Sequence, residues 1–226
     1  METSPLKNNA GFFIPLRQTA EEFGMTVKYN ADTRTVMLYS QPPKTDEKEP
    51  VFTINFPQDL GPWGEIPPGS ELAQLWSGYN VLGGYYTNLN NSPPNRTNNI
   101  ILACRQINGH ILKPGEVFTF NGQVGQRTAE KGYLSASIFI GRKVVPGIGG
   151  GICQLSSTLY NAALETGLEI VERHPHTLPV SYIAAGRDAT ILWGGADFKF
   201  RNNQDFNLKV LTDVYGNYVV ALLAIE

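Results

Sequence analysis

The chain has 226 residues, of which 42% are hydrophobic and 17% are charged, and its formal net charge is −2. This composition is that of a globular protein with enough length for a large core, and the absence of a basic run argues against broad nucleic-acid binding. No apolar run approaches the roughly 18–20 residues that a membrane-spanning helix needs. Residues 1–5 lack the basic and apolar regions of a signal peptide, so we expect any export signal or anchor to lie outside this sequence.

Residues 1–40 are predicted to form a small α/β unit. A short helix over 18–23, ended by Gly24, precedes two alternating strands over 25–29 and 35–39. The next residues, 41–50, are rich in Pro, Lys, Asp and Glu, which is typical of an exposed linker. We assign residues 41–82 to this linker and to a strand-and-loop region with one strand over 51–56.

The motif at 13–17, with Phe23-Gly24, Val27 and Thr35-Val36, resembles the second half of the copper amine oxidase N-terminal-like repeat. The resemblance implies a stalk or attachment module of an exported bacterial protein. The stretch contains neither histidine nor cysteine, so no copper site is implied. A generic α/β appendage is the alternative interpretation.

Residues 83–226 are predicted to form the larger domain. A helix over 97–108 has one apolar face, which includes Cys104, and a second helix follows a glycine-rich stretch. The remaining segments alternate like strands, and they lie at 117–120, 133–140, 143–146, 168–173, 180–184, 188–192, 198–201, 208–213 and 218–224. The fold class is therefore α+β, with a mainly antiparallel sheet around a central helix.

The glycine-rich stretch runs from 147 to 152 and leads directly into the central helix. Cys153 is expected in the first helical turn, where free N–H groups and the helix dipole favour a thiolate and lower the pKa of a cysteine. Gly149, Gly150 and Gly151 carry no Cβ, so a substrate can approach the backbone and N–H groups can face an oxyanion. This combination indicates acyl transfer through a thioester on Cys153. One alternative is that Cys153 is a buried structural cysteine, and another is that it forms a disulfide with Cys104. If no disulfide forms, we expect Cys104 to be buried.

The larger domain resembles the VanW family over residues 83–213. The matching blocks occur in the family's order at 99–100, 107–109, 112–121, 124–128, 149–161, 172–176, 186–190 and 197–200. The resemblance implies a cell-envelope role in Gram-positive bacteria, in a family named after glycopeptide-resistance clusters. Some members are similar to L,D-transpeptidases, which form 3-3 peptidoglycan cross-links through a cysteine acyl-enzyme, and Cys153 matches the family's cysteine.

A cysteine nucleophile needs a base, and the chain offers three histidines. His176 is the preferred partner and His174 the second choice, because a strand that returns from the central helix brings both near the helix N-terminus. His110 is expected to face water. Asp188 is a candidate to orient the imidazole. Arg173 and Arg187 are candidates to bind a substrate carboxylate, and Tyr182 and Gln154 to donate to a substrate carbonyl, although each also fits a scaffolding role.

The sequence thus predicts an extracytoplasmic, cell wall-associated cysteine acyl-transferase that acts on peptidoglycan stem peptides without a cofactor or a metal. One alternative is a non-catalytic module that binds or assembles cell wall, with a buried cysteine. Another is an internal Cys153–Gln154 thioester that tethers the protein to a surface amine.

Overall fold

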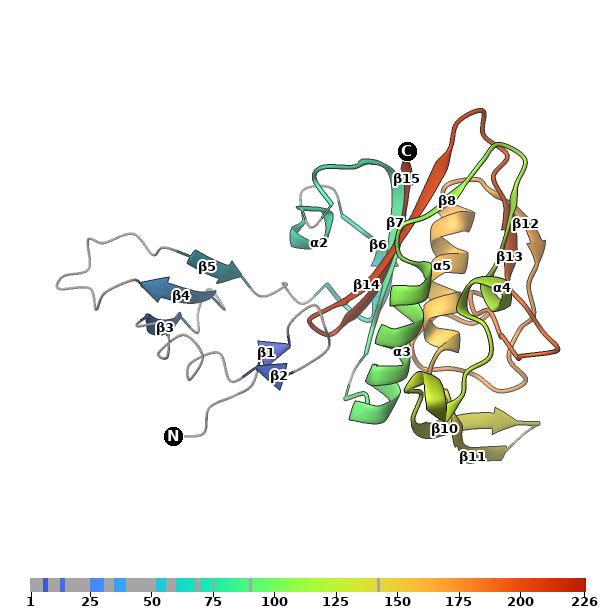
Figure 1. Cartoon of the computed structure of the whole chain (residues 1–226), viewed down its shortest axis with the longest axis horizontal. Coiled ribbons are helices and arrows are strands. Elements are labelled where there is room, and N and C mark those ends of the chain that lie inside the picture. Colours follow the sequence, from blue (N-terminus) through green and yellow to red (C-terminus); the bar gives the residue numbers. More distant parts are fainter. Residues whose placement is uncertain are drawn as a thin grey trace. The chain divides into compact units, whose positions relative to one another are not determined.

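The computed structural model describes residues 6–7, 13–14, 25–30, 35–39, 52–55, 60–67, 70–74, 76–89, 91–141 and 143–226. The chain divides into two compact units, residues 1–59 and 60–226 (Figure 1). The three-part division at residues 40 and 82 stays a prediction.

The smaller unit contains short antiparallel strands. β1 (Leu6–Lys7) pairs with β2 (Phe13–Ile14), and a separate sheet has the order β3-β4-β5. These last strands are β3 (Thr26–Asn30), β4 (Thr35–Tyr39) and β5 (Phe52–Asn55), close to the predicted positions. The helix expected over 18–23 and the linker over 41–50 lie outside the described residues, and the copper amine oxidase-like resemblance stays a prediction.

A five-stranded antiparallel sheet is the centre of the larger unit, and its order is β6-β7-β15-β14-β8. The strands are β6 (Trp63–Glu65), β7 (Asn80–Asn88), β15 (Tyr218–Ile225), β14 (Leu208–Tyr215) and β8 (His110–Leu112). Because successive side chains of a strand point to opposite faces, β15 contributes to two apolar clusters. Val219, Ala221 and Leu223 lie in the main core, whereas the alternate residues pack with Leu72 and Trp76 on the other face.

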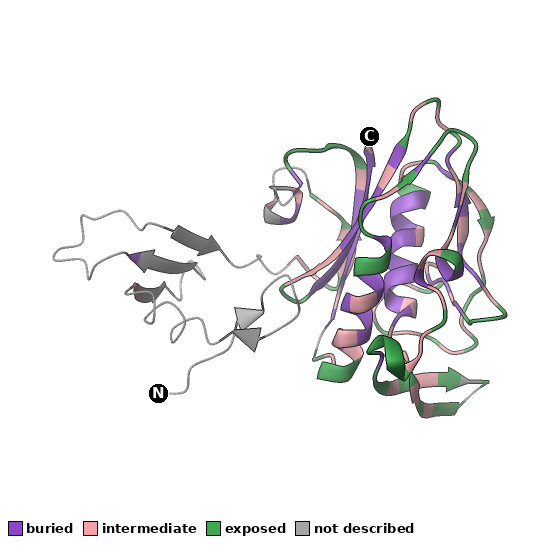
Figure 2. Cartoon of the chain, in the orientation of Figure 1, coloured by how far each residue is buried: buried purple, intermediate pink, exposed green. Residues whose placement is uncertain are grey.

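Two helices cover the main-core face of this sheet, as Figure 1 shows. α3 (Pro94–Ile107) has proline in its first turn, and its buried Ile100, Ala103, Cys104 and Ile107 recur at the helical spacing. α5 (Cys153–Glu165) contacts β7 and β15 and is buried along most of its length (Figure 2). It is the central helix that the sequence predicts.

Smaller elements complete the larger unit. They are the short helix α2 (Glu71–Gln74), the sheet β12-β13-β9 (Glu169–Glu172, Lys199–Arg201 and Val117–Thr119), the helix α4 (Phe120–Val124), the 3-10 turn at Ala129–Lys131, and the hairpin of β10 (Ser135–Ile140) and β11 (Lys143–Ile148). The mixed helices and mainly antiparallel strands confirm the α+β class. α4 was not expected, since the predicted strand over 117–120 ends one residue inside it.

The strands predicted over 180–184 and 188–192 are wrong, because residues 173–198 contain neither helix nor strand. The backbone of this segment finds other partners. Ala189 N–H donates to Ser157 Oγ at 2.9 Å and Thr190 N–H donates to His174 O at 2.8 Å. We call residues 173–198 the site loop.

Candidate active site

Cys153 is the first residue of α5 and is half-buried, with a free thiol. Its Sγ lies 3.7 Å from the carbonyl oxygen of Ile191 in the site loop. Cys104 is also free and fully buried in α3, and burial raises the pKa of its thiol well above the usual value. The Cys104–Cys153 disulfide is therefore not formed, and the two thiols occupy very different environments.

The turn before α5 needs all three of its glycines. Gly149 and Gly151 have φ of +80° and +102°, which L side chains rarely adopt. A Cβ at Gly150 would lie 2.6 Å from the backbone oxygen of Ser137. Gly149 N–H donates to Leu134 O at 3.1 Å, so an oxyanion site at this turn has to use N–H groups that follow Gly149.

One buried side chain, Asn99 of α3, holds this turn in place. Its Nδ2 donates to Gly150 O and to Leu134 O, both at 2.9 Å, while its Oδ1 accepts from Leu134 N–H at 2.7 Å. The amide thus ties α3 to the glycine turn and to the start of the β10–β11 hairpin. Sequence reasoning assigned no role to Asn99.

The imidazole of His176, in the site loop, lies close to Cys153 and interacts with it electrostatically. Its Nδ1 is 2.6 Å from Asp188 Oδ2, so Nε2 is the ring nitrogen left for the sulfur. The same carboxylate oxygen accepts the backbone N–H of His176. The ring lies between Phe139 and Tyr182, with edge-on contacts at centroid distances of 5.9 and 6.5 Å.

The charges of this constellation reinforce one another. Burial disfavours the imidazolium, but the hydrogen bonds to Cys153 and Asp188 outweigh it and raise the pKa of His176 above its usual value. Burial also disfavours the Asp188 carboxylate, but the hydrogen bonds from the His176 backbone and ring lower the pKa of Asp188. The site therefore favours an ionised aspartate beside a protonated imidazole.

These shifts predict how stability depends on pH. A raised histidine pKa stabilises the fold fully below the unfolded value of about 6.5, and this contribution disappears as the pH rises through the folded value. The lowered pKa of Asp188 adds stability that is lost as the pH falls below about 3.9. The difference in unfolding free energy between wild type and His176→Phe should therefore be largest between about pH 4 and 6.5, measured by urea titration. A difference that grows above pH 6.5 would contradict this assignment.

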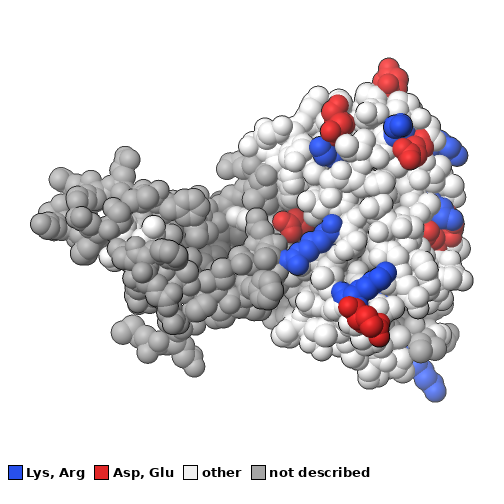
Figure 3. All heavy atoms as spheres, viewed as in Figure 1, with Lys and Arg blue, Asp and Glu red and all other residues white. Residues whose placement is uncertain are grey.

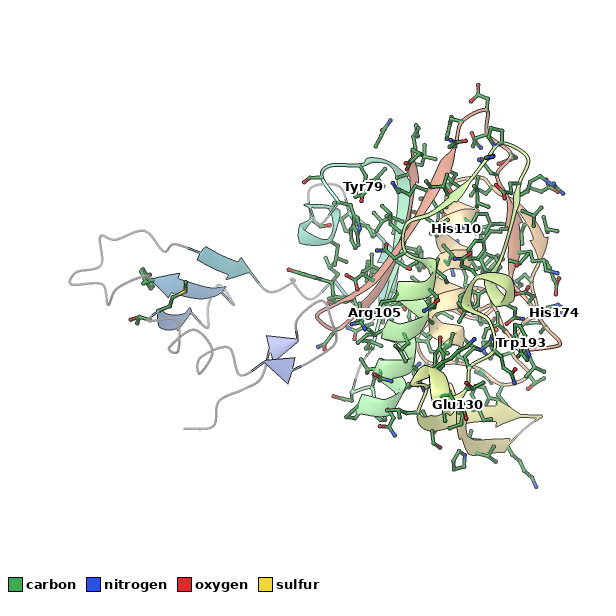
Figure 4. The ribbon with its side chains drawn as sticks, in the orientation of Figure 1. Tyr79, Arg105, His110, Glu130, His174 and Trp193 are labelled. Carbon is green, nitrogen blue, oxygen red and sulfur yellow. The ribbon has the colours of Figure 1, made fainter. Side chains whose placement is uncertain are left out.

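The other two histidines lie elsewhere. The His174 side chain is 48% exposed, against 5% for His176, and its Nε2 is 2.9 Å from Glu172 Oε1. His110 lies on the edge strand β8 (Figure 4). Its ring contacts that of Phe118. The geometry thus favours His176 over His174 as the partner of Cys153.

Arg173 and Arg187 both bind groups of the protein. Arg173 forms an ion pair with Asp188 Oδ1 at 2.9 Å and donates to Asp188 O at 2.6 Å. Arg187 pairs with Glu165 and with Asn161 Oδ1, near the far end of α5 from Cys153. Arg173 therefore fixes the position of Asp188, whereas Arg187 lies away from the sulfur.

The site loop is attached to α5 by buried polar side chains of the helix. Ser156 Oγ donates to Ala189 O at 2.6 Å, Ser157 Oγ accepts from Ala189 N–H, and Asn161 Nδ2 donates to Arg187 O at 2.7 Å. These three residues bond to the backbone on either side of Asp188. The sequence analysis gave these three residues no role. A run of polar residues at 156–158 in a helix that is otherwise expected to be buried does indicate that their side chains bond to other buried polar groups.

Gln154 points away from Cys153, because successive helical residues do not share a face. Its Oε1 accepts from Arg96 Nη2 at 2.6 Å, and its Nε2 donates to Thr87 Oγ1 and to Asn88 O, both at 3.0 Å. With both amide atoms bonded to the protein, the geometry supports neither a substrate contact by Gln154 nor an internal thioester.

Tyr182 carries a buried hydroxyl that has no hydrogen-bond partner among the described residues. Ser157 Oγ is close to it; this oxygen donates to Cys153 O and accepts from Ala189 N–H, and its second lone pair is the acceptor available to the phenol. Burial, together with the nearby charge of Cys153, raises the pKa of the phenol, so it remains a neutral donor. Tyr182 thus places a neutral hydroxyl near both Ser157 and the cysteine.

Two arginines that sequence reasoning missed lie beside the glycine turn. Arg96 comes from α3, with its guanidinium carbon 5.8 Å from the centre of the Tyr182 ring, and Arg127 follows α4. Burial lowers the pKa of both guanidinium groups, whereas the charge of Cys153 opposes this shift. No spacing pattern in the sequence distinguishes these two arginines from the others, so their place at the site could not be predicted.

Three observations concern the rest of the molecule. On the face drawn in Figure 3, cationic and anionic side chains are interspersed and form no broad patch of either sign. Within the described ranges no cluster of three or more His, Cys, Asp or Glu is arranged to hold a metal ion. Among the helices of those ranges, none combines the length and the apolar character that crossing a bilayer requires.

The fold and the site together define an α+β protein with a Cys–His–Asp constellation at the start of a central helix. The chain belongs to the family described as VanW like protein, whose model matches residues 95–223. It is 45% identical over 142 residues to the uncharacterized protein YoaR of Bacillus subtilis, an alignment that covers 63% of this chain and 47% of YoaR.

A second relative is the vancomycin B-type resistance protein VanW of Enterococcus faecalis. The identity is 34% over 121 residues, which cover 51% of this chain and 44% of that protein. The chain thus spans less than half the length of these two curated relatives. No solved structure matches it.

Proposed function

We propose that this protein is a cell-envelope cysteine acyl-transferase that acts outside the cytoplasm on peptidoglycan stem peptides, in the manner of an L,D-transpeptidase. The observation that carries the proposal is the position of Cys153 close to an imidazole that Asp188 holds through Nδ1. Membership of the VanW-like family and the resistance protein among its relatives support the cell-wall context.

The proposed reaction has two steps. Cys153 Sγ attacks the carbonyl carbon of the third residue of a donor tetrapeptide, and the C–N bond to the terminal D-amino acid breaks. The leaving amine takes its proton from His176, and a thioester remains on Cys153. An acceptor amine then attacks the thioester, gives a proton to His176 and releases the thiolate, which yields a 3-3 cross-link. Attack by water instead gives a carboxypeptidase.

The surroundings of the sulfur support acyl transfer in particular. Cys153 lies at the start of a thirteen-residue helix, so the positive end of the helix dipole faces the negative charge that develops during acyl transfer. The neutral Tyr182 hydroxyl and the N–H groups after Gly149 are the donors that an oxyanion would meet. Asp188 is held by Arg173, which keeps the imidazole in one orientation.

The test is incubation of the purified protein with tetrapeptide muropeptides, followed by mass spectrometry of the products and of the protein. We expect cross-linked dimers or shortened stems, together with a covalent adduct on the peptide that contains Cys153. Cys153→Ala should abolish both, while Cys104→Ala serves as the matched control because that thiol is buried.

Products that persist in Cys153→Ala would overturn the proposal. If no product forms and Cys153 resists alkylation in the folded protein, a non-catalytic wall-binding module becomes the better description. An intact mass lower by one ammonia would instead indicate the internal thioester.

A further inference from the structure

The side chains of Arg127 and Arg96 lie against the two ends of the glycine turn that precedes Cys153. A Cβ at Gly149 would lie 2.9 Å from Arg127 Cβ, and one at Gly151 would lie 2.4 Å from Arg96 Cγ. Both guanidinium groups are near enough to Cys153 for their charges to interact with it. Anything bound at the sulfur therefore lies in the field of two cations.

Neither arginine makes an ion pair with a carboxylate in the part of the chain that the structure describes. Arg173, Arg187 and Arg201 each make one, with Asp188, Glu165 and Glu169. Asp197 is the carboxylate that interacts with Arg127 from a distance, but its Oδ1 accepts the N–H groups of Asn121 and Phe198. Removing a cation from water without pairing it with an anion costs free energy, and such unpaired cations often belong to ligand sites.

Arg127 has the edge needed to bind such a ligand. Its Nη1 donates to Asn121 Oδ1 at 2.7 Å and to Gly125 O at 2.9 Å, so the side chain is fixed from one side. Its Nε and Nη2 have no hydrogen-bond partner among the described residues. These two atoms form the fork by which arginine binds a carboxylate through two parallel hydrogen bonds. Arg96 differs, because its Nη1 and Nη2 both donate to protein groups, Ser92 and Gln154.

We propose that Arg127 binds a free carboxylate of the acyl donor through Nε and Nη2, and so selects acidic peptides that carry this group close to the reacting carbonyl. This inference rests on the proposed acyl transfer at Cys153 and specifies its substrate class. Arg96 adds positive charge, but it offers no pair of unbonded N–H groups for a carboxylate. A donor whose carboxylate is replaced by a carboxamide has the same shape but leaves Arg127 unpaired, so it is a poor substrate.

The test uses iodoacetate and iodoacetamide, two alkylating reagents of similar size that differ in a carboxylate. With either reagent the thiolate displaces iodide from the CH2 carbon, so an S–C bond forms as the C–I bond breaks. The readout is the ratio of the iodoacetate to the iodoacetamide rate at Cys153, divided by the same ratio for free N-acetylcysteine. A change in the fraction of thiolate cancels in this ratio, so it reports only on recognition of the carboxylate.

In the wild type we expect a normalised ratio of about ten or more, saturation with iodoacetate, and protection by acetate. Arg127→Gln should bring the ratio close to one. Arg127→Lys, which keeps the charge but lacks the fork, should give an intermediate value. Arg201→Gln is the matched control, since this arginine of β13 pairs with Glu169 on the neighbouring strand β12, and it should leave the ratio unchanged.

Because Arg127 also donates to Asn121 and Gly125, thermal unfolding of its variants is compared with that of the wild type to detect any loss of stability. Protection of the wild type by acetate is a test that needs no variant. A wild-type ratio near one, or a high ratio that persists in Arg127→Gln, overturns the carboxylate site but leaves the nucleophile in place. Resistance of Cys153 to both reagents overturns the nucleophile itself and, with it, this inference.

Discussion

Replacing His176 by glutamine is expected to lower the rate of acyl transfer by about 10³-fold, within the range typical of general acid–base catalysis. The substitution removes the group that protonates the leaving amine and accepts the proton of the incoming one. Glutamine can still receive a hydrogen bond from the protein, but it cannot carry the proton. The measurement is the rate of product formation from tetrapeptide muropeptides under single-turnover conditions, together with the rate of Cys153 alkylation by iodoacetamide at pH 7.

Two further histidine variants make this result specific. His110→Gln changes a residue on the edge strand β8 and should retain wild-type rates. His174→Gln removes an exposed side chain that pairs with Glu172, and we expect less than a twofold change. A large loss in His174→Gln together with an active His176→Gln would reverse the assignment of the base.

Replacing Asn99 by alanine is expected to reduce the free energy of unfolding by about 3 kcal/mol, since each unpaired buried polar group costs about 1–3 kcal/mol. Two groups lose their partner, namely Gly150 O and Leu134 N–H, while Leu134 O keeps the bond from Gly149 N–H. For a chain of this size the loss corresponds to a fall in melting temperature of about 10 °C. Because Gly150 is part of the turn before Cys153, the alkylation rate of Cys153 should also fall in the folded variant.

Asn95→Ala provides the matched control. Asn95 lies one helical turn earlier on α3, and its Nδ2 donates to Ser135 O at 3.0 Å, but the residue is exposed. Water can replace that bond, so we expect a change within about 0.5 kcal/mol. Equal destabilisation by the two variants would show that burial of the Asn99 amide is not the cause.

Periodicity in the sequence was sufficient for the elements that pair or pack regularly. The helices α3 and α5 and the hairpin of β14 and β15 lie close to their predicted positions, because their apolar spacing follows the contacts that they make. The site loop is different. Ile183, Ala189 and Ile191 are buried there, so the apolar pattern correctly indicated burial, yet the backbone bonds to helix side chains rather than to a strand. Spacing alone does not distinguish these two kinds of buried segment.

The candidate site could be predicted in part for a similar reason. Cys153, His176 and Asp188 are residue types with characteristic chemistry, and the fold brings these three together. Their roles in catalysis stay a prediction. The arginines were the harder case, because which of them finds a carboxylate depends on tertiary contacts. Arg173 does so within the site loop, whereas Arg127 is directed by Asn121, a residue of a short helix that no pattern indicated.

The division of the site between a helix and an irregular segment has a consequence for regulation. Cys153 belongs to α5, whereas its imidazole and carboxylate partners both belong to residues 173–198, which Ser156, Ser157 and Asn161 fasten to the helix. If those bonds open and Ile183, Ala189 and Ile191 leave the core, the sulfur loses its imidazole partner while the five-stranded sheet stays intact. We therefore expect local opening of this segment to stop the reaction without unfolding the whole protein, and hydrogen exchange at the amide of Ala189 would report that opening.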